Sequence, residues 1–143
     1  GLSGAVTFDE PRFRSAPNRI PGIVGKAMRF DGKGQFEEVA DSRSFQVGDA
    51  DFSVELWVRT TSGKAIRNLI DFRNDKPLGW TIFIQVGKPG FQVADGGAIT
   101  YASATAPITD GRWHHLVAVA KRLPPQPSVL WVDGAGPRPS GHN

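Results

Sequence analysis

The chain has 143 residues, no cysteine, and 17 Lys and Arg residues against 14 Asp and Glu residues, which gives a net charge of +3. The lack of cysteine excludes disulfides, thiolate metal sites and cysteine nucleophiles. The cations are spread along the chain and no apolar run approaches the roughly 18 residues of a membrane helix, so we expect neither a nucleic-acid partner nor a membrane span.

Apolar and polar residues alternate with a period of two in many segments, whereas no long stretch keeps a helical period. In chain order, this pattern predicts strands at residues 5–8, 27–30, 36–39, 52–58, 68–72, 80–86, 91–94, 99–102, 114–120 and 129–132. In the clearest case, 52–58, the even positions are apolar and the odd positions include Glu55 and Trp57. The segment 114–120 is almost entirely apolar, which predicts a strand buried on both faces.

Turn sequences separate these segments. Asp-Gly pairs occur at 31–32, 95–96, 110–111 and 133–134, and Lys-Pro-Gly occurs at 88–90. Such residues favour tight turns between strands. Many short strands joined by turns predict an all-β sandwich or barrel. We expect residues 1–134 to form one domain, followed by a Pro/Gly-rich tail at 135–143.

Four segments carry a family pattern in a fixed order. They are GIVGKAMRFDG at 22–32, DFSVELWV at 51–58, DGRWHHLVA at 110–118 and LWVDG at 130–134. Together they resemble the laminin-G-like jelly-roll domains of the concanavalin A-like superfamily. The resemblance implies a two-sheet antiparallel β-sandwich with jelly-roll topology.

The resemblance also implies further strands after the LWVDG hairpin, where only nine residues remain. Either the sandwich lacks its last strands or it is completed differently. A missing strand would leave an open sheet edge, and such an edge can pair with another copy of the chain. Self-association through that edge is therefore one expected mode of interaction.

A sugar-binding surface combines an aromatic ring for the apolar side of a pyranose with polar groups for its hydroxyls. Trp57 shares a strand face with Glu55 and Arg59, which provides this combination. Trp80 is expected near the rim, and the polar loop after residue 72 is a second candidate for ligand contact. The candidate ligand-binding residues are Glu55, Trp57, Arg59, Arg73, Asn74 and Trp80. The alternative for Trp57 is a packing role at a position of the family pattern.

The resemblance implies that calcium is a candidate cofactor, since many members hold this ion at the sandwich rim by carboxylates and carbonyls. Asp31, Asp75 and Asp133 are the candidate ligands of a structural calcium ion. The alternative is that these aspartates only make Asx turns.

Catalysis is not expected. The glucanases of this superfamily need carboxylates at alternating positions of one strand. Asp49, Asp51 and Glu55 come closest, but Ser53 interrupts the pattern. His114 and His115 are adjacent, so they point to opposite faces of a strand and cannot bind one metal ion together.

These observations leave two hypotheses. The first is a non-catalytic carbohydrate-binding or adhesive module of a secreted or surface protein, with a glycan or an extracellular protein as partner and an extracellular location, as in an exported bacterial protein. The second is a structural spacer or protein–protein interaction module without a small ligand. The fold by itself does not choose between them.

Overall fold

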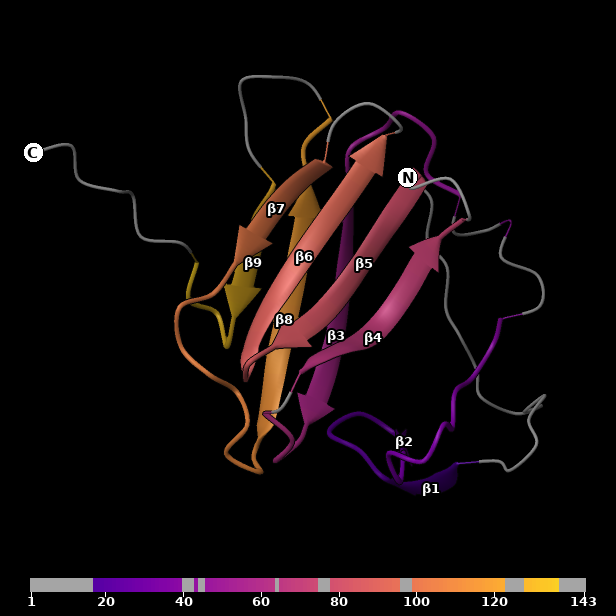
Figure 1. Ribbon diagram of the computed structural model, residues 1–143, viewed down its shortest axis with the longest axis vertical. Helices are drawn as coiled ribbons and strands as arrows, with labels where there is room; N and C mark the ends of the chain where they lie inside the picture. Colours follow the sequence, from indigo (N-terminus) through magenta and orange to yellow (C-terminus); the bar gives the residue numbers. More distant parts are fainter. Residues whose placement is uncertain are drawn as a thin grey trace, which may run out of the picture. The chain divides into compact units, whose positions relative to one another are not determined.

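A computed structural model of the chain describes residues 17–39, 43, 46–63, 65–74, 78–95, 99–122 and 128–136 (Figure 1). The strands within these residues are β1 Asn18–Pro21, β2 Lys26–Arg29, β3 Phe52–Arg59, β4 Ile66–Arg73, β5 Leu78–Gln85, β6 Lys88–Asp95, β7 Ile99–Ser103, β8 Trp113–Ala120 and β9 Val129–Val132. The chain divides into two compact units, Gly1–Gly48 and Asp49–Asn143.

The described part of the first unit contains the antiparallel pair β1 and β2, joined by a tight turn in which the Gly22 amide donates to the Gly25 carbonyl over 2.9 Å. The expected strand at 27–30 corresponds to β2. The prediction of a strand at 36–39 is wrong, because the structure has no strand at these residues. β1 was missed because its sequence, NRIP, has no apolar alternation. The expected strand at 5–8 lies outside the described residues.

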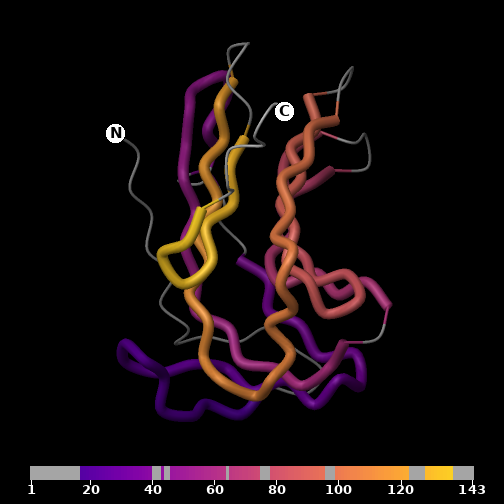
Figure 2. Tube along the Cα trace, turned by 90° about the vertical axis from the view of Figure 1, so that its left-hand side faces the viewer, coloured from indigo at the N-terminus to yellow at the C-terminus, as the bar shows by residue number. Residues whose placement is uncertain are grey.

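In the second unit, two antiparallel sheets pack face to face (Figure 2). One sheet has the order β3-β8-β9 and the other has the order β4-β5-β6-β7. The residues buried between them are Trp80, Ile82, Ile84, Phe91, Val93, Ile108, Leu116, Ala118, Ala120 and Leu130. This arrangement confirms the predicted all-β sandwich.

The alternation predicted for β3 is confirmed, because its even positions are half-buried against the core and its odd positions are exposed. For β8 the prediction of burial on both faces is wrong. Leu116, Ala118 and Ala120 are buried, whereas Val117 and Val119 on the other face are only half-buried. The reason is that β8 lies in the middle of a sheet with one face outward, and this outer face carries apolar side chains.

The turn expected at 88–90 is also wrong. The hairpin turn lies at Val86 and Gly87, which have φ values of 50° and 81°. Positive φ at both central residues is the conformation of a two-residue hairpin turn whose twist matches that of the strands. Residues 88–90 already belong to β6, where Lys88 lies opposite Gln85.

Candidate functional site

The predicted ligand-binding residues lie on opposite sides of the sandwich. Glu55, Trp57 and Arg59 are on the outer face of the sheet β3-β8-β9. Arg73 ends β4 in the other sheet, and Asn74 closes the β4–β5 connection by a hydrogen bond from its amide to the Leu78 carbonyl. Because the two sheets pack through their inner faces, one small ligand cannot contact both groups.

Trp80 does not lie at the rim, so the expectation of an accessible ring is wrong. The residue is 7% exposed and belongs to the core. Its ring stacks on Phe72, with centroids 5.7 Å apart, and lies tilted against Phe52 at 5.9 Å. The physical reason is the register of β5, in which the even positions Trp80, Ile82 and Ile84 all point inward.

The outer face of β3-β8-β9 is rich in aromatic side chains. Trp57 lies opposite His115 on β8, and their rings stack with centroids 4.7 Å apart. The His115 Nε2 is 3.1 Å from Glu55 Oε2. The Arg59 guanidinium lies over the Trp113 ring, 5.0 Å from its centroid, which is a cation–π contact. Trp57 remains 42% exposed, so part of its indole is available to a ligand.

Trp131 joins this face from β9. It lies opposite Val117, and Val117 lies opposite Glu55, so these three residues form one row across the sheet. Trp131 is 41% exposed, and its six-membered ring lies beside Gly136, where an added Cβ would be 2.6 Å from it. We call this set the aromatic face: Glu55, Trp57, Arg59, Trp113, His115, Val117 and Trp131. The alternation of side chains in 129–132 indicates that Trp131 points away from the core. Only the pairing of β9 with β8 shows that it lies on the same face as Trp57.

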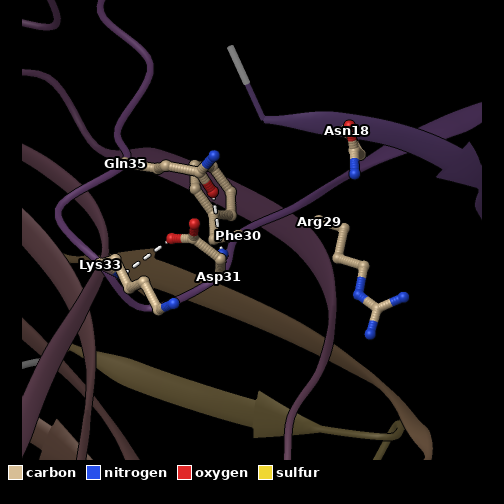
Figure 3. Close-up of a pocket in the computed structure, with 6 residues that line it drawn as sticks. All are labelled: Asn18, Arg29, Phe30, Asp31, Lys33 and Gln35. Carbon is tan, nitrogen blue, oxygen red and sulfur yellow. Dashed lines mark hydrogen bonds between the residues drawn. The ribbon is translucent and has the colours of Figure 1, made fainter. Parts of the chain in front are cut away.

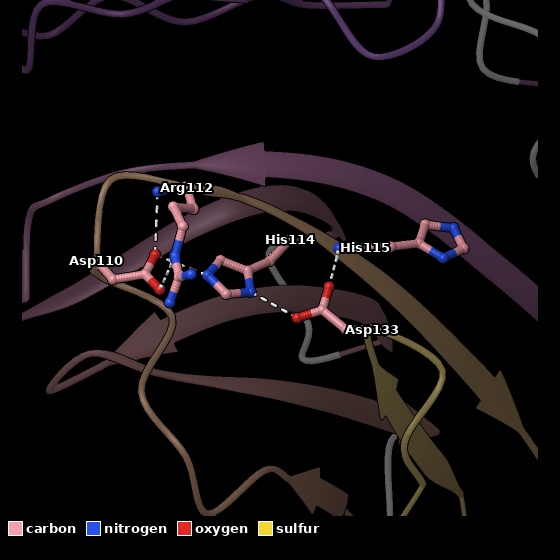
Figure 4. Close-up of polar contacts among 5 residues, drawn as sticks. All are labelled: Asp110, Arg112, His114, His115 and Asp133. Atoms are coloured by element: carbon pink, nitrogen blue, oxygen red, sulfur yellow. Dashed lines mark hydrogen bonds and ion pairs between the residues drawn. The ribbon is translucent and has the colours of Figure 1, made fainter.

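Behind this face, His114 is held between two carboxylates (Figure 4). Its Nε2 is 2.8 Å from Asp110 Oδ1 and its Nδ1 is 2.7 Å from Asp133 Oδ2. A carboxylate only accepts hydrogen bonds, so these two contacts favour the charged imidazole, which carries hydrogen on both ring nitrogens. The other oxygen of Asp133 accepts from the His115 amide over 2.8 Å. The two histidine rings point to opposite sides, as the sequence predicted.

The charges of this cluster shift one another's pKa values. Hydrogen bonds to Asp110 and Asp133 raise the pKa of His114 against the opposing effect of burial. The hydrogen bond from His114, together with that from the Arg112 amide, lowers the pKa of Asp110. Burial opposes ionisation of Asp133, but the hydrogen bonds from His115 and His114 outweigh it and lower its pKa. The cluster is therefore an ion-pair network. Asp110 connects the β7–β8 loop to β8, and Asp133 connects the β9 turn to the same strand.

The network makes stability depend on pH. The pKa of His114 is raised, so its contribution is complete below the ordinary value of 6.5 and is lost as pH rises through the folded-state value. The carboxylate contributions are present above their ordinary pKa of 3.8 and are lost as pH falls through the lowered values. We expect the difference in unfolding free energy between the native chain and His114→Gln to be larger at about pH 6 than at about pH 9. Urea unfolding across this range measures it, and a difference that grows with pH would contradict the assignment.

The structure does not test the calcium site predicted from the sequence. Asp31 belongs to the first unit and Asp133 to the second, and Asp75 lies outside the described residues. Both oxygens of Asp133 already accept hydrogen bonds from His114 and His115. Within the described ranges no group of three or more His, Asp or Glu residues could hold a metal ion. Calcium binding remains a prediction.

Asp31 instead lines a pocket of about 510 Å³ in the first unit (Figure 3). Its Oδ1 accepts from the Lys33 amide over 2.8 Å, which is the Asx turn considered as the alternative to calcium binding. Its own amide donates to Gln35 Oε1 over 2.8 Å. Arg29, Lys33 and Asp31 mix both signs of charge around this pocket, so it has no clear preference for an ion.

The carboxylates nearest to a glucanase pattern have separate partners. Asp51 accepts from the Arg122 amide over 2.8 Å and from Lys121 Nζ over 3.1 Å, and these bonds lower its pKa. Glu55 contacts His115. An acid and a nucleophile in a glycosidase must face one bond together, and these two carboxylates are engaged at different points of the sheet.

The described residues include no helix with the length and hydrophobicity needed to cross a membrane. A comparison with curated proteins found no match. Among solved structures, the chain is similar to the binding domain of Paraclostridial Mosquitocidal Protein 1, with a TM-score of 0.69 and 16% identity over 89% of this chain and 34% of that one. It is also similar to domains LG4-5 of the mouse laminin alpha1 chain, with a TM-score of 0.50 and 23% identity over 62% of this chain and 22% of that one.

The chain thus spans about a third of the length of the first structure and about a fifth of the length of the second. At sequence identities this low, the similarity shows a shared fold. A family described as the concanavalin A-like lectin/glucanases superfamily, of laminin G type, matches residues 31–135. That range contains three of the four segments on which the resemblance rests and begins inside the fourth. The chain therefore belongs to the concanavalin A-like lectin/glucanases superfamily, as a laminin-G-like β-sandwich.

Proposed function

We propose that this domain is a non-catalytic binding module that binds carbohydrate through the aromatic face. The observation that carries the proposal is the exposed indole of Trp57, stacked on His115 and placed between Glu55 and Arg59 on the same strand face. An indole packs well against the apolar C–H groups of a pyranose, and the neighbouring carboxylate and guanidinium bind hydroxyl groups.

Two further points support this function. The separate engagement of Asp51 and Glu55 favours binding over glycoside hydrolysis. One of the similar solved structures is described as a binding domain, although that description applies to the other protein. This function places the module in a secreted or surface protein, because glycan chains are displayed outside the cytoplasm.

A glycan array on the purified chain, run with calcium and again with chelator, tests the proposal. We expect binding to a defined glycan class, and Trp57→Ala to lower the affinity about tenfold or more, which corresponds to about 1.4 kcal/mol. Loss of binding in chelator would add a metal ion to the site.

Tyr101→Ala is the matched control, because Tyr101 is an exposed aromatic residue, 62% accessible, on β7 of the other sheet. Circular dichroism shows whether each variant keeps its fold. A blank array with folded protein, or an equal loss of affinity in the Tyr101 variant, would count against a carbohydrate site on the aromatic face.

The second candidate is a protein-interaction module. Trp and Arg are enriched among the residues that dominate protein interfaces, and the aromatic face presents Trp57, Trp131 and Arg59 together. This function predicts a concentration-dependent oligomer or a complex with a protein partner, without glycan binding. Light scattering over a range of protein concentrations, repeated with Trp57→Ala, measures whether the chain forms such an oligomer.

A further inference from the structure

The aromatic face has two separate exposed indoles. Trp57 is on β3 and Trp131 is on β9, the two outside strands of the sheet β3-β8-β9. In the register, Trp57 lies opposite His115 and Trp131 lies opposite Val117, so the two tryptophans are also two residues apart along the strands. Neighbouring strands are about 4.8 Å apart and the rise is about 3.4 Å per residue, which separates the two α-carbons by about 12 Å. This span is wider than one sugar ring.

The surface between the indoles comes from β8. His115 and Val117 lie on the line from Trp57 to Trp131, and both are half-buried. The His115 ring stacks on Trp57, and Val117 lies opposite Trp131, so one ring and two methyl groups lie between the indoles. We call this path the strip, and a ligand that follows it crosses the three strands obliquely.

The charged groups beside the strip are Glu55, whose side chain is 74% exposed, and Arg59, which lies on the same strand face. A carboxylate has about four acceptor positions, so Glu55 still has capacity after its bond to His115. The acceptors of Glu55 and the donors of Arg59 bind the hydroxyl groups of a neutral sugar, and their opposite charges leave no net charge that would attract an ionic group. The charges therefore favour an uncharged saccharide.

We propose that the aromatic face binds an extended neutral oligosaccharide of at least three sugar units, with Trp57 and Trp131 as its two aromatic contacts. This inference rests on the proposed carbohydrate-binding function. A short saccharide contacts one indole, whereas a longer chain contacts both, and the second contact then forms within the same complex at a high effective concentration.

The test is calorimetric titration with oligomers of one to six units of β-1,4-linked glucose and of β-1,4-linked N-acetylglucosamine. Their equatorial linkages give straight chains with apolar C–H groups on the ring faces. We expect the affinity to rise about tenfold or more between two and four units. Trp131→Ala should remove this rise, whereas Trp57→Ala should weaken binding at every length. Tyr101→Ala should show the same affinities and the same length dependence as the native chain.

The outcomes separate this inference from the function on which it rests. Binding that needs Trp57 but does not change with length, or a length dependence that survives Trp131→Ala, overturns the two-contact site and leaves the proposed function in place. Tighter binding of a heparin hexasaccharide than of the neutral oligomers overturns the preference for uncharged ligands. Binding on the glycan array without binding of either oligomer series also overturns the inference, whereas a blank array overturns both.

Gly136→Ala provides an independent variant that keeps both indoles. The added Cβ would lie 2.6 Å from the Trp131 ring, so the ring or the chain at residue 136 must move. We expect this variant to reduce the gain in affinity with length. An unchanged gain in affinity, in a variant whose near-ultraviolet circular dichroism shows that the ring has moved, would contradict the role of Trp131.

Discussion

Gly79→Ala is expected to lower the free energy of unfolding by about 3 kcal/mol or more, through backbone strain and overpacking together. A Cβ at this position would lie 1.9 Å from the Phe72 carbonyl oxygen, and the φ of Gly79 is +124°. The contact is with backbone, so no side-chain rotation relieves it. The close approach of β4 and β5 at this point also stacks Phe72 on Trp80. Substitution should therefore disturb the aromatic part of the core.

Gly134→Ala is the matched control for this prediction. Gly134 also has a positive φ, of +78°, but nothing lies within 4 Å of an added Cβ. Its substitution should cost about 1–2 kcal/mol, the ordinary penalty for a left-handed conformation. Urea unfolding of both variants measures the two effects. Equal losses of unfolding free energy in the two variants would show that the contact with Phe72 adds nothing to the cost of the positive φ.

Asp133→Ala is expected to lower the free energy of unfolding by about 2 kcal/mol. Two fully buried hydrogen bonds to a charged group would contribute more, but the Asp133 side chain is half exposed and solvent weakens them. The substitution removes the acceptor for His114 Nδ1 and the acceptor for the His115 amide. It leaves the charged imidazole with Asp110 alone. The β9 turn then loses its side-chain hydrogen bonds to β8 and keeps the bond from the amide of residue 133 to the His115 carbonyl.

Asp49→Ala is the control for Asp133, because Asp49 is an exposed aspartate in the turn before β3 and its removal changes the net charge equally. Its effect should stay within about 0.5 kcal/mol. The loss caused by Asp133→Ala should also shrink as pH falls through the lowered pKa of Asp133, since the native carboxylate is then protonated. A loss that is independent of pH would show that Asp133 acts through turn geometry and not through its charge.

The candidate site was only partly predictable. The face shared by Glu55, Trp57 and Arg59 follows from the alternation along one strand and was predicted correctly. Trp131 was not predicted as part of this face, because its place depends on the pairing of β9 with β8. Trp80 was assigned to the rim because it follows a glycine, although the same alternation that worked for β3 places it in the core.

The sequence by itself determined the family, the strand-rich fold and the inward or outward direction of side chains within a strand. These properties depend on short motifs and on the two-residue period of an extended backbone, which are local. Only the tertiary structure decided which strands are neighbours. It separated Arg73 from Arg59, brought Trp131 beside the Trp57 cluster and placed His114 between Asp110 and Asp133. These contacts depend on hydrogen bonds between strands distant in sequence, and the residues of one strand do not encode the register of another.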